Sequence, residues 1–483
     1  MEHSTIMQFH DQNIPIPFLK NQNKEYHFGT LNVMVDSETL KQNHKHFIFS
    51  IDKSGSMMYR CKDDKTKLQH IQFTLENMLR MFVTSDLECS IHINVFDDEA
   101  STCVSNTRIN KHNIEELIVK INAIEALGST NLEDALKLAT KDILHYKAQH
   151  PDHDINHILL TDGVPTVKHI SADILKQYVL ESHQNIFLGY GTDHDPMLLE
   201  QLANNKNGSY FFIDALEKAS LVYGEIIYNI TNKILVDITY TLNNAEIYNY
   251  MTNTWDTKLS QGMITNKLEK TFQIRSKKPS DAFCVIQGTH SASHKAVEMY
   301  SYLNNRETDL TKYAFRQKTQ ELLFQAKSQS ANYVFRHRWL NEIESPLKKE
   351  IHAFLVKLMD YRKEHDLEED KFTKMLCDDL FITYKTIGTD RCCIYTCARQ
   401  SSQGRQTTYH VSLDDDDINE INDDDDDDDD ELFPYMLSDH IDSPYATNDL
   451  MQTMLTCSQT QTQIHEFDFE DQTEDCDCQT QSL

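Results

Sequence analysis

Residues 45–56, KHFIFSIDKSGS, decide the fold of this chain. The part up to Ile51 is a short apolar run of the kind expected for a β-strand that is buried on both faces of a sheet. The loop that follows, Asp52-Lys-Ser54-Gly-Ser56, presents one carboxylate and two hydroxyls, with a glycine relaxing the backbone between the serines. We therefore expect a central strand whose carboxyl end carries a tight loop of oxygen-bearing side chains.

On the C-terminal side of this strand, helical and strand patterns alternate along the chain. Further strands are expected at 89–96, 155–160, 185–188 and 210–213. Helices are expected at 68–83, 114–124, 132–146, 171–183, 196–204 and 216–230. Strands that alternate with helices predict a mostly parallel sheet that is covered on both faces and joined by right-handed crossovers. The fold class expected for residues 45–230 is thus α/β, a doubly wound sheet of the Rossmann-like kind.

A second unit, made of strands, is expected on either side of this α/β domain. Polar turns separate five strand-like stretches, at 24–35, 234–242, 245–251, 267–274 and 282–287. They suit a small antiparallel β-sandwich formed by residues 24–44 and 231–295, with the α/β domain inserted into it. Residues 1–23 are predicted to be an irregular N-terminus.

The remainder of the chain is predicted to be helical and then disordered. Helical periodicity within residues 300–390 predicts two or three helices packed as hairpins. Residues 400–483 are rich in Ser, Gln, Thr and Asp, and residues 423–430 are all aspartate. Such a composition buries too little apolar surface to offset chain entropy, so we expect a disordered acidic tail.

The net charge of −30 is concentrated in this tail. Residues 411–483 hold 24 Asp and Glu and no Lys or Arg, so the rest of the chain carries only −6. No basic patch indicates nucleic-acid binding. No apolar stretch reaches the length of a membrane helix, and the N-terminus lacks the pattern of a signal peptide. The eleven cysteines have irregular spacings without the paired C-x2-C of structural zinc, which favours reduced thiols and an intracellular, most simply cytoplasmic, location.

Two further oxygen-bearing side chains are expected near the loop that begins at Asp52. Thr130, in LGST, lies at the start of the helix expected from residue 132, and Asp162 follows the buried strand that precedes the TDG sequence. Ligand sites in parallel sheets form beyond the carboxyl ends of the strands, so these groups should meet at one edge. The predicted metal ligands are Asp52, Ser54, Ser56, Thr130 and Asp162. Such hard oxygen ligands suit Mg²⁺ or Mn²⁺ and leave at least one coordination position open for an outside carboxylate.

These motifs resemble the metal-ion-dependent adhesion site of the von Willebrand factor A (VWFA) domain. The match consists of D-x-S-x-S at 52–56, the threonine at 130 and T-D-G at 161–163, in the family's order, within a domain of about 45–230. The resemblance implies that the two serines and the threonine touch the metal directly, whereas the two aspartates often do so through water. It also implies that Thr130 is the ligand most dependent on conformation.

The overall layout is similar to that of intracellular VWFA proteins of plants, some of which carry a RING finger and act as ubiquitin ligases. Residues 398–408 and 445–459 contribute to this likeness. The 44 residues before the VWFA domain contain no cysteine, so a RING finger is not expected there. The low glycine content and the Asn- and Ile-rich texture are similar to those of proteins from giant DNA viruses.

The function expected from these features is non-enzymatic protein binding, in which the divalent cation held by the five predicted metal ligands binds an Asp or Glu of a partner protein. The motif loops offer no His or Glu that could act as a general base, so no catalytic residue is assigned and hydrolysis is disfavoured. The alternative is an adaptor or regulatory component of an enzyme complex, for example a ubiquitin-related one, that binds through its helical segment.

The tail leaves several interpretations open. The aspartate run is a solvated tail, a binding segment for a basic partner, or an internal pseudo-ligand that offers its own carboxylate to the metal. Residues 445–459 place Leu450, Met451, Met454 and Leu455 at helical spacing. They are either a transient amphipathic turn or a short docking motif, for which the chain's own folded body is one candidate partner.

Overall fold

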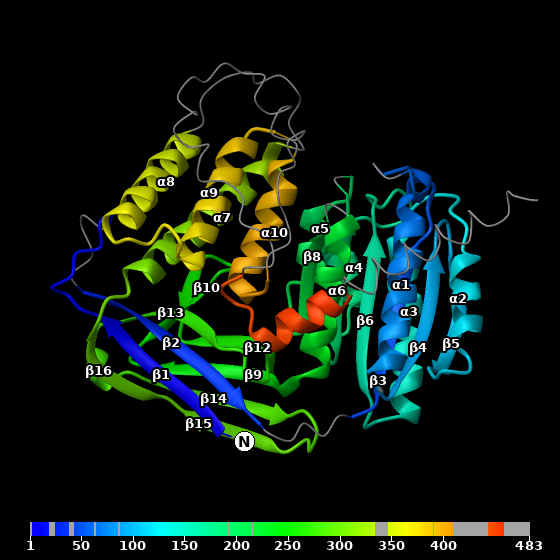
Figure 1. The fold of residues 1–483 in the computed structure, drawn as a ribbon, viewed down its shortest axis with the longest axis horizontal. Coiled ribbons are helices and arrows are strands. Elements are labelled where there is room, and N and C mark those ends of the chain that lie inside the picture. The colour runs from blue at the N-terminus through cyan, green and yellow to red at the C-terminus, as the bar shows by residue number, and fades with distance from the viewer. Residues whose placement is uncertain are drawn as a thin grey trace, which may run out of the picture.

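The computed structural model describes residues 2–18, 25–37, 43–61, 64–85, 87–191, 193–213, 216–333, 346–389, 391–408 and 443–457. Figure 1 shows an α/β domain, a two-sheet β unit beside it, and a group of helices that stands over the β unit and against the α/β domain. The α/β domain lies between β2 and β9 in the chain, and both of these strands belong to the β unit.

The α/β domain is built on a six-stranded sheet with the order β5-β4-β3-β6-β7-β8. Its strands are β3 (Lys45–Asp52), β4 (Cys89–Phe96), β5 (Ala100–Arg108), β6 (Asp154–Thr161), β7 (Gln184–Tyr190) and β8 (Gly208–Ile213). All neighbours are parallel except β4 and β5, which form an antiparallel pair at one edge. Every residue of β3 is buried, as its apolar run predicts.

Helices cover both faces of this sheet. They are α1 (Lys67–Thr84), α2 (Ile114–Asn122), α3 (Leu132–Gln149), α4 (Ala172–Leu175), α5 (Pro196–Leu202) and α6 (Leu216–Thr231), with the 3-10 turns η1 (Gly55–Met58) and η2 (Lys176–Tyr178). The apolar sides of α1, α2 and α6 share one core, whereas α3 and α5 contribute to the core on the other face. A capping box between Thr66 and Gln69 fixes the start of α1.

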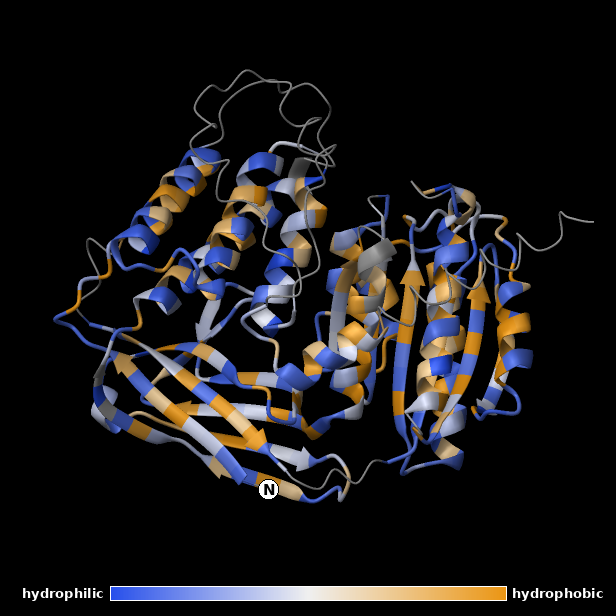
Figure 2. Ribbon diagram, viewed as in Figure 1, coloured by the Kyte–Doolittle hydropathy of each residue, from blue (hydrophilic) through white to orange (hydrophobic). Residues whose placement is uncertain are grey.

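The β unit consists of two packed sheets around a separate apolar core. One sheet has the order β11-β10-β13-β2-β1-β16 and the other β12-β9-β14-β15. The strands are β1 (Glu2–His10), β2 (His27–Asp36), β9 (Lys233–Asn243), β10 (Glu246–Asn249), β11 (Thr254–Asp256), β12 (Lys258–Thr265), β13 (Lys270–Ser276), β14 (Phe283–His290), β15 (Ala296–Tyr300) and β16 (Tyr302–Thr308), and Pro279–Asp281 forms the turn η3. Figure 2 shows hydrophobic and hydrophilic residues alternating along β1 and β2, as expected for strands with one buried face.

The helical group shares an apolar core with the α/β domain, which it meets through its last helix. It comprises α7 (Thr311–Tyr333), α8 (Pro346–Glu364), α9 (Lys371–Thr386) and α10 (Cys392–Arg405). Their buried residues belong to the same core as those of α5, and α10 contacts both α5 and β8. No helix among the described residues is long and apolar enough to cross a membrane.

The predicted fold class, an α/β fold with a doubly wound, mostly parallel sheet, is confirmed. Four local predictions were wrong, and the first is the helical segment 300–390, whose start forms strand β16 of the β unit. Residues 2–10 form β1 rather than an irregular segment, because the strand pairs with β2 along most of its length. Residues 171–183 hold only the short α4 and η2. The edge strand β5 was missed because it is mostly exposed and polar, with only Val104 buried.

The predicted disordered tail was also wrong in part. Helix α10 continues to Arg405, and residues 448–457 are helical as well. Leu450 and Met454 are buried against Leu221 and Tyr228 of α6. Of the two interpretations of residues 445–459, a transient turn or a docking motif, docking onto the chain's own folded body is therefore confirmed. The aspartate run at 423–430 and residues 458–483 lie outside the described residues.

Candidate metal site

Two buried carboxylates stand at the carboxyl edge of the α/β sheet. Asp52 is the last residue of β3, and Asp162 directly follows β6. These strands are parallel neighbours, paired from Lys45 with Asp154 up to Ile51 with Leu160, so their carboxyl ends emerge side by side. Both aspartates are fully buried. The register of β3 and β6 therefore decides that the two side chains share one site.

Hydrogen bonds connect these carboxylates through the serine loop. The Ser54 backbone N–H donates to Asp52 Oδ1 over 2.8 Å. The two serine hydroxyls lie 3.1 Å apart, and Ser56 Oγ donates to Asp162 Oδ1 over 2.8 Å. The chain of contacts runs from one aspartate to the other through both serines, so four of the five predicted ligands are brought together.

The fifth predicted ligand, Thr130, reaches the same place from the loop before α3. Its backbone is fixed by two 3.0 Å hydrogen bonds with Thr166, one in each direction. A methyl group built on Gly163 would lie 3.3 Å from Thr130 Oγ1 and 3.4 Å from Ser56 Oγ. The two hydroxyls thus face the same small space beside Gly163, which a larger residue would narrow.

Backbone contacts tie the loops of the site to one another. Gly55 N–H donates to the Gly128 carbonyl over 2.9 Å, and Leu127 N–H donates to the Lys53 carbonyl over 2.7 Å. Gly128 has a φ of +84°, a conformation that favours glycine. The serine loop and the threonine loop therefore hold each other in place.

Burial dominates the electrostatics of Asp52. It raises the pKa of this carboxyl to about 6, against hydrogen bonds from Thr161 and Ser54 that lower it, and the charge of Asp162 raises it further. Thr161 Oγ1 donates to Asp52 Oδ2 over 2.5 Å. Hydroxyl and backbone donors surround this carboxylate, and a positive charge beside it would favour its ionised form.

A lysine that the sequence analysis did not single out balances the other aspartate. Lys67, the first residue of α1, places Nζ 2.9 Å from Asp162 Oδ2 and 2.9 Å from Asp193 Oδ2. Burial lowers the pKa of this lysine, but its two carboxylate partners outweigh burial and raise the pKa overall. The position of Lys67 at the start of α1 is a sequence signal that could have identified it. The helix dipole disfavours a positive charge in the first turn unless a carboxylate lies nearby.

This set of donors fits a small, hard divalent cation. Two carboxylates and three hydroxyls are the oxygen ligands that Mg²⁺ and Mn²⁺ prefer. Within the part of the chain that the structure describes, no group of three or more His, Cys, Asp or Glu side chains could hold a metal ion. A cation at the sheet edge would therefore depend on the hydroxyls as well as the carboxylates.

Comparison with known families identifies the domain that carries this site. Residues 47–223 match the sequence model of the von Willebrand factor type A (VWA) domain. The chain contains a VWA domain. Domains of this family are protein-interaction modules, and proteins that contain them are generally not enzymes.

Curated relatives and solved structures give the extent of the similarity. The human inter-alpha-trypsin inhibitor heavy chain H4 is 28% identical over 204 residues, which cover 41% of this chain and 21% of the relative. The chain spans about a fifth of the length of the curated relatives it matches. The ArnB paralog VWA2 from Sulfolobus acidocaldarius is 15% identical with a TM-score of 0.49, covering 85% of this chain and 99% of that one. A von Willebrand factor type A protein from Catenulispora acidiphila is 13% identical with a TM-score of 0.48, covering 73% and 85%.

Proposed function

We propose that the VWA domain binds a divalent cation, Mg²⁺ or Mn²⁺, and through it an Asp or Glu of a partner protein. The cation is held by Asp52, Ser54, Ser56, Thr130 and Asp162. The single observation that carries the proposal is the hydrogen-bonded chain from Asp52 to Asp162 through both serines, at the edge where strand-end loops form ligand sites.

When bound, the cation supplies a positive charge and at least one open coordination position for an oxygen from outside. The residues of this chain do the rest. The aspartates provide the negative charge, the hydroxyls of Thr130 and Ser56 face the same space beside Gly163, and Lys67 neutralises part of the charge of Asp162. A partner carboxylate is the natural occupant of an open position because it brings a negative charge of its own.

Apolar side chains on the same loops support a protein as the partner. Met58 and Tyr59 follow the serine loop, Leu127 precedes Gly128, and Val164 follows Gly163. These four side chains are 58%, 64%, 71% and 47% exposed. Large apolar groups gathered around a polar centre are typical of protein interaction sites. We infer that the acidic residue of the partner is surrounded by apolar side chains on the partner's surface.

The alternative, binding through the helical group, has less support. The buried faces of α7, α9 and α10 pack into the core that they share with α5. An intracellular location stays part of the proposal, and the cysteines of the described residues are all free thiols. Two hypotheses about the acidic tail concern residues that the structure does not describe. One is that the tail binds a basic partner, and the other is that the tail's own carboxylates bind the metal.

Calorimetry and affinity capture test this function. The wild type should take up one Mg²⁺ or Mn²⁺, and Asp52→Ala should abolish this uptake without unfolding the chain. Partners captured from cell extract should be lost both with EDTA and with Asp52→Ala. Asp173→Ala, an exposed aspartate of α4, is the matched control and should behave as wild type. Metal uptake that is unchanged in Asp52→Ala would disprove the proposed site.

A further inference from the structure

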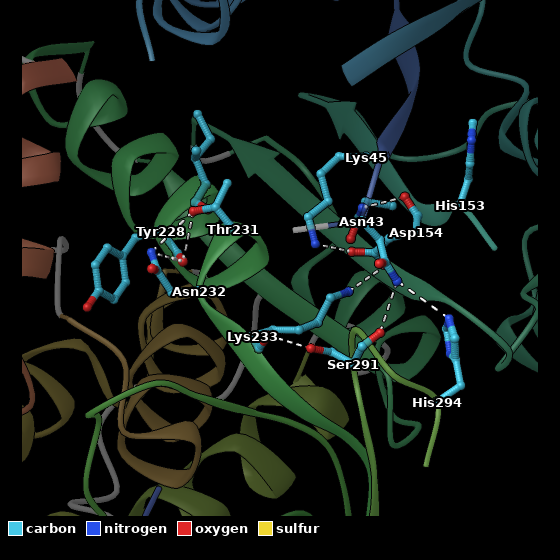
Figure 3. Close-up of polar contacts among 12 residues, drawn as sticks. Asn43, Lys45, His153, Asp154, Tyr228, Thr231, Asn232, Lys233, Ser291 and His294 are labelled. Atoms are coloured by element: carbon cyan, nitrogen blue, oxygen red, sulfur yellow. Dashed lines mark hydrogen bonds and ion pairs between the residues drawn. The ribbon is translucent and has the colours of Figure 1, made fainter. Parts of the chain in front are cut away.

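A cavity lies at the opposite edge of the VWA sheet, where the sheet meets the β unit. Its volume is about 280 Å³. The amino ends of β3, β6 and β9 reach it, and the loop after β14 closes another side (Figure 3). The cavity is thus shared between two structural units and far from the metal edge.

Two lysines in this cavity share one carboxylate. Lys45 Nζ lies 2.7 Å from Asp154 Oδ2, and Lys233 Nζ lies 2.6 Å from Asp154 Oδ1. The side chains of the two lysines are only 5% and 7% exposed. Figure 3 shows both ammonium groups directed at this one aspartate. The trio therefore holds a surplus positive charge in a poorly solvated place, which is unfavourable without a counter-ion.

Neighbouring charged groups do not remove this surplus. Asp237 also lines the cavity, but Lys206 Nζ lies 2.5 Å from it. Asp152 and Lys147 also line the cavity, and their charges are opposite. The Lys147 ammonium donates to the carbonyls of Pro151 and His153. These four groups contribute two positive and two negative charges, so Lys45, Lys233 and Asp154 still leave one positive charge over.

Uncharged hydrogen-bonding groups complete the lining. His183 is 8% exposed, and its Nε2 has no hydrogen-bond partner among the described residues. Asn43 Nδ2 donates to the Ser291 carbonyl over 3.1 Å, and His294 Nε2 lies 3.5 Å from the same nitrogen. A buried ring nitrogen without a partner indicates that a ligand or water belongs beside it.

We propose that this cavity binds a phosphate group, either inorganic phosphate or a small phosphate monoester. Each lysine uses one of its three N–H donors on Asp154, so both retain donors for a second acceptor. A phosphate offers several strong acceptor oxygens and the negative charge that the trio lacks. The cavity is larger than a phosphate ion, so it has room for the organic part of a small ester.

The test is calorimetric titration of the full chain with inorganic phosphate at constant ionic strength. We expect saturable binding to the wild type and at least tenfold weaker binding to Lys233→Gln. That variant leaves Lys45 and Asp154 as a one-to-one pair, so the fold is expected to persist. Lys120→Gln, whose ammonium pairs with Glu116 on the surface of α2, is the matched control and should bind as the wild type does.

A second variant keeps the test decisive if a lysine substitution prevents folding. His183→Ala leaves the charged trio intact and should weaken phosphate binding severalfold. A parallel titration with glycerol 3-phosphate separates the two sources of the phosphate group: tighter binding than inorganic phosphate assigns the site to an ester, and weaker binding assigns it to the free ion. Absence of saturable binding to the wild type, or equal affinity in wild type and Lys233→Gln, would overturn the proposal.

Discussion

The two edges of the VWA sheet carry opposite charge patterns. At the carboxyl edge, the one lysine Lys67 pairs with Asp162 and Asp193, and Asp52 lies beside Asp162. At the amino edge, two lysines share one aspartate. The first pattern leaves negative charge over and the second leaves positive charge over. This difference is the basis of the two proposals, a cation at the carboxyl edge and an anion at the amino edge.

The strands that span the sheet supply charge to both edges. β3 begins with Lys45 and ends with Asp52, which an extended strand separates by about 23 Å. β6 begins with Asp154 and is followed by Asp162. The apolar middle of each strand keeps the two sets of charges apart, so neither edge can neutralise the other. Strand ends, rather than strand faces, therefore carry the charged groups on which both proposed binding sites depend.

Removal of the shared aspartate should have the largest effect on stability. Asp154→Asn leaves two buried ammonium groups without a counter-ion, so we expect a loss of about 3–5 kcal/mol of unfolding free energy. Chemical denaturation measures it, and Asp173→Asn on the surface is the control. A loss below about 1 kcal/mol would show that solvent already screens the amino edge.

The histidines buried in the sheet should make the fold sensitive to acid. Burial lowers the pKa of His157, in β6, to about 4. The unfolded chain takes up this proton near pH 6.5 and the folded chain only near pH 4, so stability is complete above pH 6.5 and falls as the pH drops through this window. His157→Gln should shift the acid-unfolding midpoint to lower pH, followed by circular dichroism. A midpoint that does not move would assign the acid sensitivity to other groups.

Lys67→Met should separate the stability of the carboxyl edge from its affinity for metal. Without the ammonium, Asp162 and Asp193 lose their partner, and the metal-free chain should lose about 2–4 kcal/mol. Mg²⁺ should restore much of this loss, and its affinity should rise severalfold because the site becomes more negative. Lys120→Met provides the comparison. A weaker affinity would mean that Lys67 positions Asp162 rather than competing with the cation for its charge.

Gly163→Ala should have the smallest effect on stability and act mainly on metal binding. The added methyl would press on the hydroxyls of Thr130 and Ser56 at 3.3 and 3.4 Å. We expect Mg²⁺ affinity to fall about tenfold, equivalent to about 1.4 kcal/mol, with little change in thermal unfolding. Unchanged affinity would indicate that these hydroxyls do not take part in coordination.

The α/β fold and the residues of the metal edge could be predicted from local patterns. The apolar run of β3 and the regular alternation of strands and helices predict a parallel sheet. Parallel strands end at one edge, which placed Asp52 and Asp162 at the same edge; that they lie side by side follows from the pairing of β3 with β6 in the folded sheet. Thr130 could be placed because its loop leads directly into α3.

Only the tertiary structure decided the polar packing of the helical end. The Ser- and Gln-rich composition of α10 predicted disorder from residue 400 onward. Instead, Arg399 and Gln403 both donate to the buried Asp379 of α9, over 2.7 and 2.6 Å. Polar residues can be buried when partners satisfy them, and such partners lie on another helix, where composition cannot reveal them.

The sequence by itself determined the sheet, the serine loop and the negative edge, because these follow from short-range patterns and from the geometry of parallel strands. The positive edge was decided by the tertiary structure alone. Lys233 belongs to a strand of the β unit and Asp154 to the VWA domain, 79 residues away, so their pairing depends on how two units dock. Charge pairing between units leaves no periodic trace in the sequence, and it becomes visible only when the folded chain brings the strand ends together.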